Sequence, residues 1–278
     1  MTFMSRRCVA LLIGICTLPA VLCSGCDKND KNSGTPSAQS PADRAVSVAA
    51  AADLKYALDD VAAEFQKSHP AIKVNLTYGS SGNFYSQLSN KAPFDIFFSA
   101  DIEFPKKLIA AGLAVKDSQF KYAVGRIVVW VPKDSAIDVE KLGIESLAQP
   151  SVKKIAIANP EHAPYGRAAE AAMKKLGVYE RVKDRLVLGE NIAQTAQFVE
   201  TGAADVGIIA LSLAVAPAMK DKGKYWTVPL DAYPTLEQGG VILSWAKDAQ
   251  ATEQFKAFVT GPEGLAILNR YGFTLPAE

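Results

Sequence analysis

The folded portion of this sequence contains no cysteine and almost no histidine. All four cysteines lie in the first 26 residues of the 278-residue chain, and the only histidines are His69 and His162. A three-histidine metal centre is therefore excluded, as are a thiolate site and a disulfide beyond those residues. The charges nearly cancel, with 30 Lys and Arg against 29 Asp and Glu. This balance argues against a strongly basic, nucleic-acid-binding protein.

Catalytic motifs are also missing. The sequence has no G-x-S-x-G motif, which would be typical of a serine hydrolase. A Ser-His-Asp triad would need one of the two histidines, and neither lies beside such a motif. We interpret His162 as a loop residue that shapes the segment before Tyr165, and Asp95 and Asp101 as loop and cap residues. We expect no enzyme activity and no cofactor.

The first 26 residues have the pattern of a bacterial export signal. Arg6 and Arg7 precede an apolar run, residues 8–23, that is too short for a transmembrane helix. Small residues before Cys26 resemble a lipobox. We therefore expect a signal peptide over residues 1–25 and a lipidated Cys26, the alternative being an ordinary signal peptide cleaved nearby. Residues 26–45 are polar and predict a flexible tether, which places the folded part outside the cytoplasm, close to a membrane.

The rest of the chain alternates between short apolar strands and amphipathic helices. Strands are predicted over residues 46–50, 72–78, 95–99, 154–158, 185–188, 205–210 and 241–246. The intervening segments show helical spacing of apolar residues, which predicts a mostly parallel sheet with helices on its faces. A longer apolar run, residues 122–131, predicts a crossover between two domains.

Four of the predicted strand-to-helix junctions are candidate anion sites. They are Ala52-Asp53, Ser80-Ser81, Tyr165-Gly166 and Asn191-Ile192. In open α/β sheets, ligands bind at the carboxyl ends of strands, where a helix start presents unpaired N–H donors and a positive dipole end. Serine and aspartate also begin helices simply as caps. An anion site therefore requires several junctions to converge, which periodicity cannot show.

Seven segments, in order, resemble the periplasmic molybdate-binding proteins of ABC transporters. They are AAADLKYAL (50–58), YGSSGNFYSQL (78–88), APFDIFFSAD (92–101), ANPEHAPYG (158–166), GENIAQT (189–195), TGAADVGIIALS (201–212) and GPEGLAILNRYGF (261–273). The resemblance implies an α/β type II periplasmic binding protein fold. Its two lobes each have a mixed, mostly parallel sheet flanked by helices, and two crossover strands join them. We expect one lobe over 46–124 and 238–278, and the other over 125–237.

The same resemblance implies the ligand-binding residues. Ser81 falls on the second serine of the family's serine loop, and Ile192 falls on a backbone N–H contact. Tyr165 lies where some members carry a ligand-binding tyrosine. Ala52 and Asp53 occupy the first helix start, where some members have a serine or asparagine ligand. No residue is expected to bind a cation directly.

Two positions depart from the family's pattern. Asp53 is an anion where a neutral donor is expected, and a carboxylate aimed at a dianion would be repelled by about 1–4 kcal/mol. We therefore expect the Asp53 side chain to cap its own helix, so that only the N–H groups of Ala52 and Asp53 face the ligand. Ala210 stands in a stretch where some members place a ligand-binding tyrosine, and Tyr165 or, more weakly, Ser212 would supply that hydroxyl.

The resulting hypothesis is a lipid-anchored, monomeric solute-binding protein on the periplasmic side of a bacterial membrane. It would capture molybdate or tungstate, reject the smaller sulfate and deliver its cargo to an ABC permease, without contacting nucleic acid. One alternative is a binding protein for another oxyanion or a small organic anion. Two others come from different classes: an extracytoplasmic enzyme on a two-lobed fold, and a surface interaction module.

Overall fold

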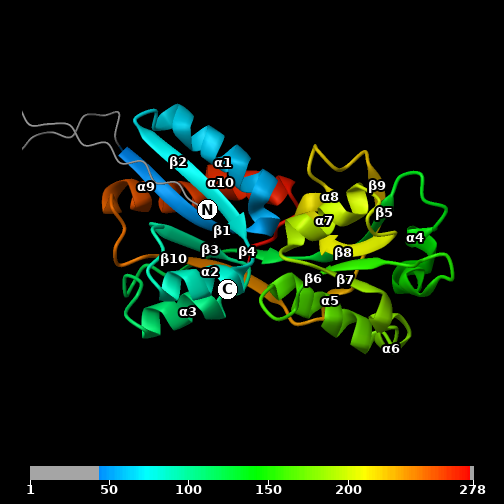
Figure 1. Cartoon of the computed structure of the whole chain (residues 1–278). Coiled ribbons are helices and arrows are strands. Elements are labelled where there is room, and N and C mark those ends of the chain that lie inside the picture. The colour runs from blue at the N-terminus through cyan, green and yellow to red at the C-terminus, as the bar shows by residue number, and fades with distance from the viewer. Residues whose placement is uncertain (1–43, 276–278) are drawn as a thin grey trace, which may run out of the picture. The chain divides into compact units, whose positions relative to one another are not determined.

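The computed structural model describes residues 44–275, whose strands form two five-stranded sheets (Figure 1). The predicted signal peptide, Cys26 and the tether up to residue 43 lie outside the described residues. The first sheet has the strand order β2-β1-β3-β10-β4, and the second has the order β7-β6-β8-β5-β9. We call each sheet with its helices a lobe.

The first lobe combines strands from both ends of the chain. Its strands are β1 (Arg44–Ala51), β2 (Ile72–Gly79), β3 (Ile96–Ser99), β4 (Phe120–Gly125) and β10 (Leu236–Ile242). Its helices are α1 (Lys55–Ser68), α2 (Ser81–Ser89), α3 (Glu103–Ala110), α9 (Ala249–Thr260) and α10 (Pro262–Arg270), with a short 3-10 helix, η2 (Ala52–Leu54), before α1. Strand β1 pairs in parallel with β2 and β3, whereas β10 runs antiparallel to β3 and β4.

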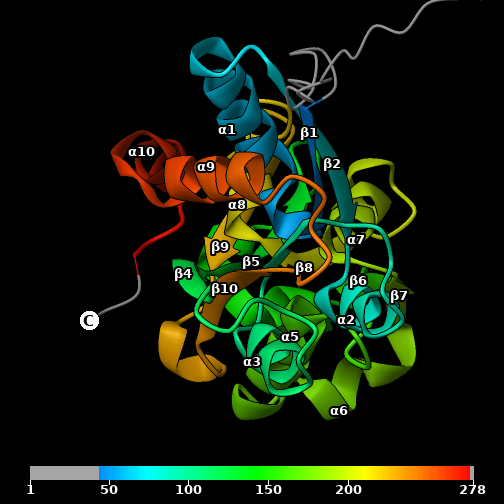
Figure 2. The same ribbon diagram turned by 90° about the vertical axis from the view of Figure 1, so that its left-hand side faces the viewer.

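Alternation along β1 gives the first sheet two apolar faces. Val48 and Ala50 pack in a core with α1, α9 and α10, whereas Ala49 packs in a separate core with α2 and α3. Successive side chains of a strand point to opposite faces, so a strand buried on both sides reads as a continuous apolar run. Figure 2 shows these two helical layers, with α9 and α10 beside α1 and with α2 and α3 across the sheet.

The second lobe repeats this arrangement. Its strands are β5 (Ile127–Pro132), β6 (Ile155–Ala158), β7 (Leu186–Gly189), β8 (Val206–Ala210) and β9 (Gly223–Thr227). Its helices are α4 (Val139–Leu142), α5 (Pro164–Lys175), α6 (Tyr179–Val182), α7 (Ile192–Glu200) and α8 (Leu211–Ala214), with 3-10 turns η3 (Gly143–Ala148), η4 (Lys183–Arg185) and η5 (Leu230–Ala232). Strand β6 is parallel to β7 and β8, and β5 is antiparallel to β8 and β9.

The predicted crossover is confirmed, because the apolar run 122–131 becomes β4 in the first sheet and β5 in the second. The return strand β10 begins at Leu236, five residues before residue 241, where the strand was predicted to begin. Strand β9 was not predicted, and the helix predicted over 211–220 is shorter, because α8 ends at Ala214. Within residues 44–275, no helix is both long and apolar enough to span a membrane.

Candidate anion-binding site

Segments from both lobes meet around one small cavity. It is lined by residues 51–53, 79–81 and 163–165 together with Ala100 and Ile192. The cavity therefore brings together all five residues that the sequence predicted as ligand contacts: Ala52, Asp53, Ser81, Tyr165 and Ile192. Each lies at or just after the carboxyl end of a strand, where the chain turns into a helix.

Ser81 begins α2 and is almost fully buried, with 1 % of its surface exposed. Its Oγ accepts a hydrogen bond from the Ala100 backbone N–H at 3.0 Å. The hydroxyl hydrogen of Ser81 is thus available to a ligand oxygen. The next residue, Gly82, donates its backbone N–H to the His162 carbonyl at 2.9 Å, which ties the start of α2 to the second lobe.

Ile192 begins α7, and the helix cap leaves its N–H available. The Asn191 Oδ1 accepts from the backbone N–H groups of Ala193 and Gln194, both at 3.0 Å. The N–H of a first helical residue has no carbonyl partner within its own helix. The Ile192 N–H therefore stands at the positive end of the helix dipole, beside the cavity.

The prediction that Asp53 caps its own helix is wrong. The N-cap positions of η2 and α1 are Ala51 and Leu54, and Asp53 occupies neither of them. The Asp53 Oδ2 instead accepts from the Tyr165 hydroxyl at 2.9 Å and from the Gln238 Nε2 at 2.7 Å. A buried carboxylate requires hydrogen-bond donors, and here the other lobe and the return strand β10 supply them. Asp53 as a whole is 1 % exposed and is one of the residues that line the cavity.

Burial dominates the electrostatics of this cluster. It raises the pKa of Asp53 to about 6, although the hydrogen bonds from Gln238 and Tyr165 act in the opposite direction. The pKa of Tyr165 lies well above its usual value, first because the hydroxyl is buried and then because of the Asp53 charge. Tyr165 is therefore protonated, and its single hydrogen points at Asp53.

The sequence analysis missed Gln238 and Gly125, which complete the surroundings of Asp53. Gln238 is fully buried in β10 and also donates to the Tyr165 hydroxyl at 3.0 Å. A side chain at Gly125 would collide with that hydroxyl and would place its Cβ 2.6 Å from the Gln238 Nε2. The one feature of the sequence that could have indicated Gln238 is its polar side chain just before an apolar strand segment.

The Ala210 and Ser212 positions supply no hydroxyl to the cavity. Neither residue lines it, and the Ser212 hydroxyl donates to the backbone carbonyl of Asp53 at 2.7 Å. The idea that Ser212 substitutes for the missing tyrosine is therefore wrong. Ser212 instead joins α8 of the second lobe to η2 of the first.

Polar contacts also join the lobes at the rim. Arg167 on α5 donates to Asp101, which follows β3, at 2.7 Å. Elsewhere on the rim, Asn83 on α2 donates to Glu190, which precedes α7. His162 does not line the cavity, and its carbonyl accepts the N–H of Gly82. Its expected place in a loop before Tyr165 is confirmed.

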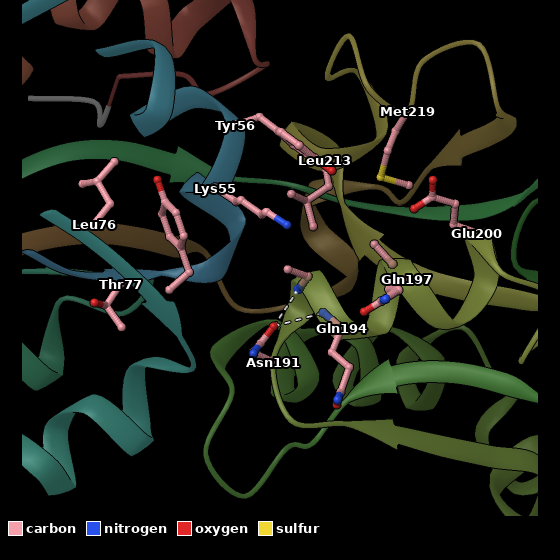
Figure 3. A pocket seen from close by; sticks show the side chains of 13 residues that line it. Lys55, Tyr56, Leu76, Thr77, Asn191, Gln194, Gln197, Glu200, Leu213 and Met219 are labelled. Carbon is pink, nitrogen blue, oxygen red and sulfur yellow. Dashed lines mark hydrogen bonds between the residues drawn. The ribbon is translucent and has the colours of Figure 1, made fainter. Parts of the chain in front are cut away.

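A wider groove lies between α1 and α7. Figure 3 shows Lys55 pointing into it from α1, across from Gln197 of α7. The dashed lines there are the two cap hydrogen bonds of Asn191. Lys55 lines this groove, whereas no lysine or arginine lines the cavity itself among the described residues.

The donor set suits an oxyanion better than a metal cation. Within residues 44–275, no three His, Cys, Asp or Glu side chains gather as a cation site would require. The cavity instead offers a hydroxyl hydrogen and the N–H groups of helix starts. Such neutral donors hold oxygen atoms of anions.

A model of the bacterial extracellular solute-binding protein family matches residues 46–274. The chain belongs to this family. It is 39 % identical over 230 residues to the molybdate-binding protein ModA of Azotobacter vinelandii, covering 83 % of this chain and 90 % of that protein. ModA of Rhodobacter capsulatus is 38 % identical over 200 residues, which cover 72 % of this chain and 77 % of that protein.

One solved structure and one further relative extend the likeness. The periplasmic molybdate-binding protein of Azotobacter vinelandii superimposes with a TM-score of 0.78 at 33 % identity, covering 84 % of this chain and all of that chain. A Bacillus subtilis protein, YvgL, provisionally named an ABC transporter substrate-binding lipoprotein, is 29 % identical over 257 residues, 91 % of this chain and 94 % of its own length. The resemblance predicted from the sequence and the two-lobed α/β fold are both confirmed.

Proposed function

We propose that this protein is an extracytoplasmic solute-binding protein that captures molybdate or tungstate in the cavity between its lobes and delivers it to an ABC permease. The main support is the convergence of neutral donors from both lobes on one buried cavity. Ser81 reaches it from the first lobe and Ile192 from the second. The relatives named as molybdate-binding proteins support the choice of ligand.

Neutral donors suit a protein that must release its cargo. A charge-assisted hydrogen bond contributes roughly 1.5–3 kcal/mol, so several of them hold a dianion without a fixed counter-charge. We assign ligand contacts to Ala52, Ser81, Tyr165 and Ile192, with Asp53 in the cavity wall. The protein needs no cofactor for this role, and we assign it no enzymatic reaction.

The proposal extends to the ends of the chain and to its partners. Residues 1–25 would be removed as a signal peptide, and Cys26 would carry lipid that holds a monomer at the periplasmic side of a bacterial membrane through the 26–45 tether. The lobes would comprise 46–124 with 238–278, and 125–237. The likeness to YvgL over nearly the whole chain supports the lipid anchor.

Titration calorimetry tests the ligand. The purified protein is titrated separately with molybdate, tungstate, sulfate and phosphate, and tryptophan emission is followed in parallel. We expect saturable one-to-one binding of molybdate and tungstate with similar affinity, because the two anions are nearly equal in size. Comparable affinity for sulfate would contradict selection by size, and no response to any of the four would remove the proposed function.

A further inference from the structure

Asp53, Tyr165 and Gln238 form a buried cluster, called here the Asp53 cluster, beside the cavity. Two of its hydrogen bonds end on one carboxylate oxygen: the Asp53 Oδ2 lies 2.9 Å from the Tyr165 hydroxyl and 2.7 Å from the Gln238 Nε2. The Gln238 Nε2 also donates to the Tyr165 hydroxyl at 3.0 Å. The other carboxylate oxygen, Oδ1, and the Gln238 Oε1 are buried and have no partner within hydrogen-bond geometry among the described residues, although the backbone N–H groups of Asp53 and Leu54 also act on the carboxylate. The cluster therefore holds two buried acceptor oxygens that lack a well-placed donor.

The missing donor matters for anion binding. An ionised Asp53 is only an acceptor, and it takes the single hydroxyl hydrogen of Tyr165. Neither residue can then donate to an anion, and the cavity wall carries a negative charge. A proton on Asp53 removes that charge and creates a new O–H donor. The Gln238 amide can turn so that its Oε1 accepts this O–H, which releases the Tyr165 hydrogen toward the cavity.

Within residues 44–275, Asp53 forms no ion pair that would neutralise its charge. The titratable groups that face it are the hydroxyls of Tyr165 on α5 and Tyr122 on β4, both buried and protonated. The remaining neighbours, Gln238 on β10 and Ser212 on α8, are uncharged. The side-chain hydrogen bonds of the Asp53 carboxylate come from Tyr165 and Gln238, and the described residues show no ion pair between Asp53 and a lysine or arginine. Arg126 follows Gly125 in the chain and acts on the pKa of Tyr233. Lys55, two positions along the same segment, is exposed and lines the outer groove.

We propose that Asp53 takes up a proton when the lobes enclose a doubly charged oxyanion, so that the protein binds the anion and a proton together. The inference rests on the proposed function. The proton comes from solvent, no covalent bond to the ligand forms, and the proton leaves again when the anion is released. Asp53 thereby acts as a specificity-determining residue whose charge adjusts to that of the ligand.

The sign of the pH dependence follows from linkage. Burial raises the pKa of Asp53 to about 6 without a ligand, and a dianion beside the carboxyl raises it further. Between these two values the complex holds one proton more than the free protein. Affinity therefore rises as the pH falls toward about 6, by up to about tenfold per pH unit, and levels off below it, where the free protein is already protonated.

Calorimetry measures the proton directly. Molybdate is titrated into the full-length protein at about pH 7.5, in buffers of different ionisation enthalpy, and the dissociation constant is followed from about pH 6 to about pH 8.5. We expect the wild type to take up close to one proton per anion. Asp53→Asn, which is neutral and of the same shape, should take up none and bind with a flat pH profile. Its profile also controls for protonation of molybdate itself.

Two further variants separate proton uptake from weak binding. Ser81→Ala should bind more weakly but still take up the proton, because it leaves the Asp53 cluster intact. Tyr165→Phe removes one donor to the carboxylate and should shift the uptake to higher pH. An infrared band of a protonated carboxyl group should appear in the wild-type complex, which keeps the test valid if Asp53→Asn fails to fold.

Saturable molybdate binding by the wild type with neither proton uptake nor the infrared band would overturn the inference while leaving the proposed function intact. Equal uptake by wild type and a folded Asp53→Asn would overturn it as well. Absence of molybdate binding in every protein and at every pH would instead remove the proposed function. The two failures are therefore distinguishable.

Discussion

Ser81 combines burial with an unused hydrogen. Its oxygen already accepts the Ala100 N–H, so the hydroxyl is oriented before a ligand arrives. Ser81→Ala should weaken molybdate binding by about 1–3 kcal/mol, because one hydrogen bond to an anion is lost and the Ala100 N–H also loses its partner. Calorimetry measures the change. Ser86→Ala, on the exposed face of the same helix, is the matched control and should bind as the wild type does.

Asp53 should also make stability depend on pH in an unusual direction. Its pKa is about 6 in the folded protein but about 3.9 in an unfolded chain. The folded state therefore favours the neutral acid, and this contribution is complete below about pH 4 and is lost as the pH rises through about 6. Asp53→Asn stays neutral throughout and should avoid a loss of up to about 3 kcal/mol at pH 8.

Denaturant unfolding of the ligand-free proteins tests this prediction. The stability of Asp53→Asn minus that of the wild type is compared at about pH 4 and pH 8, so that other titrating groups cancel. We expect a difference that is larger and more positive at pH 8. An equal difference in unfolding free energy at the two pH values would show that ionisation of Asp53 does not destabilise the folded protein.

Single residues of the site differed in how far the sequence could predict them. Ser81 and Ile192 belong to contiguous motifs at helix starts, so local pattern was enough to locate them. The direction of the Asp53 side chain depends on Gln238, which lies 185 positions away in the chain. No local pattern carries that pairing, and the local preference of aspartate for caps pointed to the wrong partner.

At the scale of elements, the start of α7 has to keep its first N–H group available while its next two are capped. Asn191 performs this capping with two hydrogen bonds of 3.0 Å. Asn191→Ala should lower stability by about 0.5–2 kcal/mol. It should also weaken molybdate binding, because the Ile192 N–H would no longer be held at a fixed position beside the cavity.

A second capped helix provides the control for Asn191. Asp138 caps α4 in the same lobe by accepting from the Lys141 N–H at 3.2 Å, and it does not line the cavity. Asp138→Ala should lower stability and leave affinity unchanged. Thermal unfolding and calorimetry on both variants measure the two effects. Equal loss of affinity in both would indicate general destabilisation rather than a role for the α7 start.

Elements buried on both faces were predicted best. Strands β1, β3, β6 and β8 read as apolar runs because helices cover both sides of their sheets. Strand β9 was missed because all five of its residues are only partly buried, at the edge of the second sheet. The start of β10 was misplaced because Gln238 and two glycines interrupt its apolar pattern where it passes the Asp53 cluster.

At the scale of the whole molecule, the ligand cavity is a product of two lobes, so its composition depends on contacts between them. The sequence predicted two α/β units from their alternating pattern, and the long apolar run 122–131 indicated the crossover. It could not predict that Ser212 and Tyr165 of the second lobe contact Asp53 of the first. Such pairings follow from packing across the lobes, which periodicity within one chain segment does not describe.

The Asp101–Arg167 ion pair should slow the release of the ligand. It joins the first lobe to the second at 2.7 Å, but the two side chains are 27 % and 41 % exposed, so solvent limits its contribution to about 0.2–1 kcal/mol. Arg167→Met keeps much of the aliphatic stem and removes the charge. We expect it to raise the dissociation rate of molybdate by about twofold to fivefold and to leave association nearly unchanged, because most of the effect of a lost contact falls on the dissociation rate.

Stopped-flow tryptophan fluorescence separates the two rates. Arg181→Met is the matched control, because Arg181 makes an equally short ion pair, 2.7 Å, with Glu145 inside the second lobe. That variant should release molybdate at the wild-type rate, since lobe opening does not break its ion pair. The difference between wild type and Arg167→Met should shrink at high salt, where exposed ion pairs are screened. Similar rates for both variants, or a change in association alone, would show that the rim pair does not hold the lobes closed.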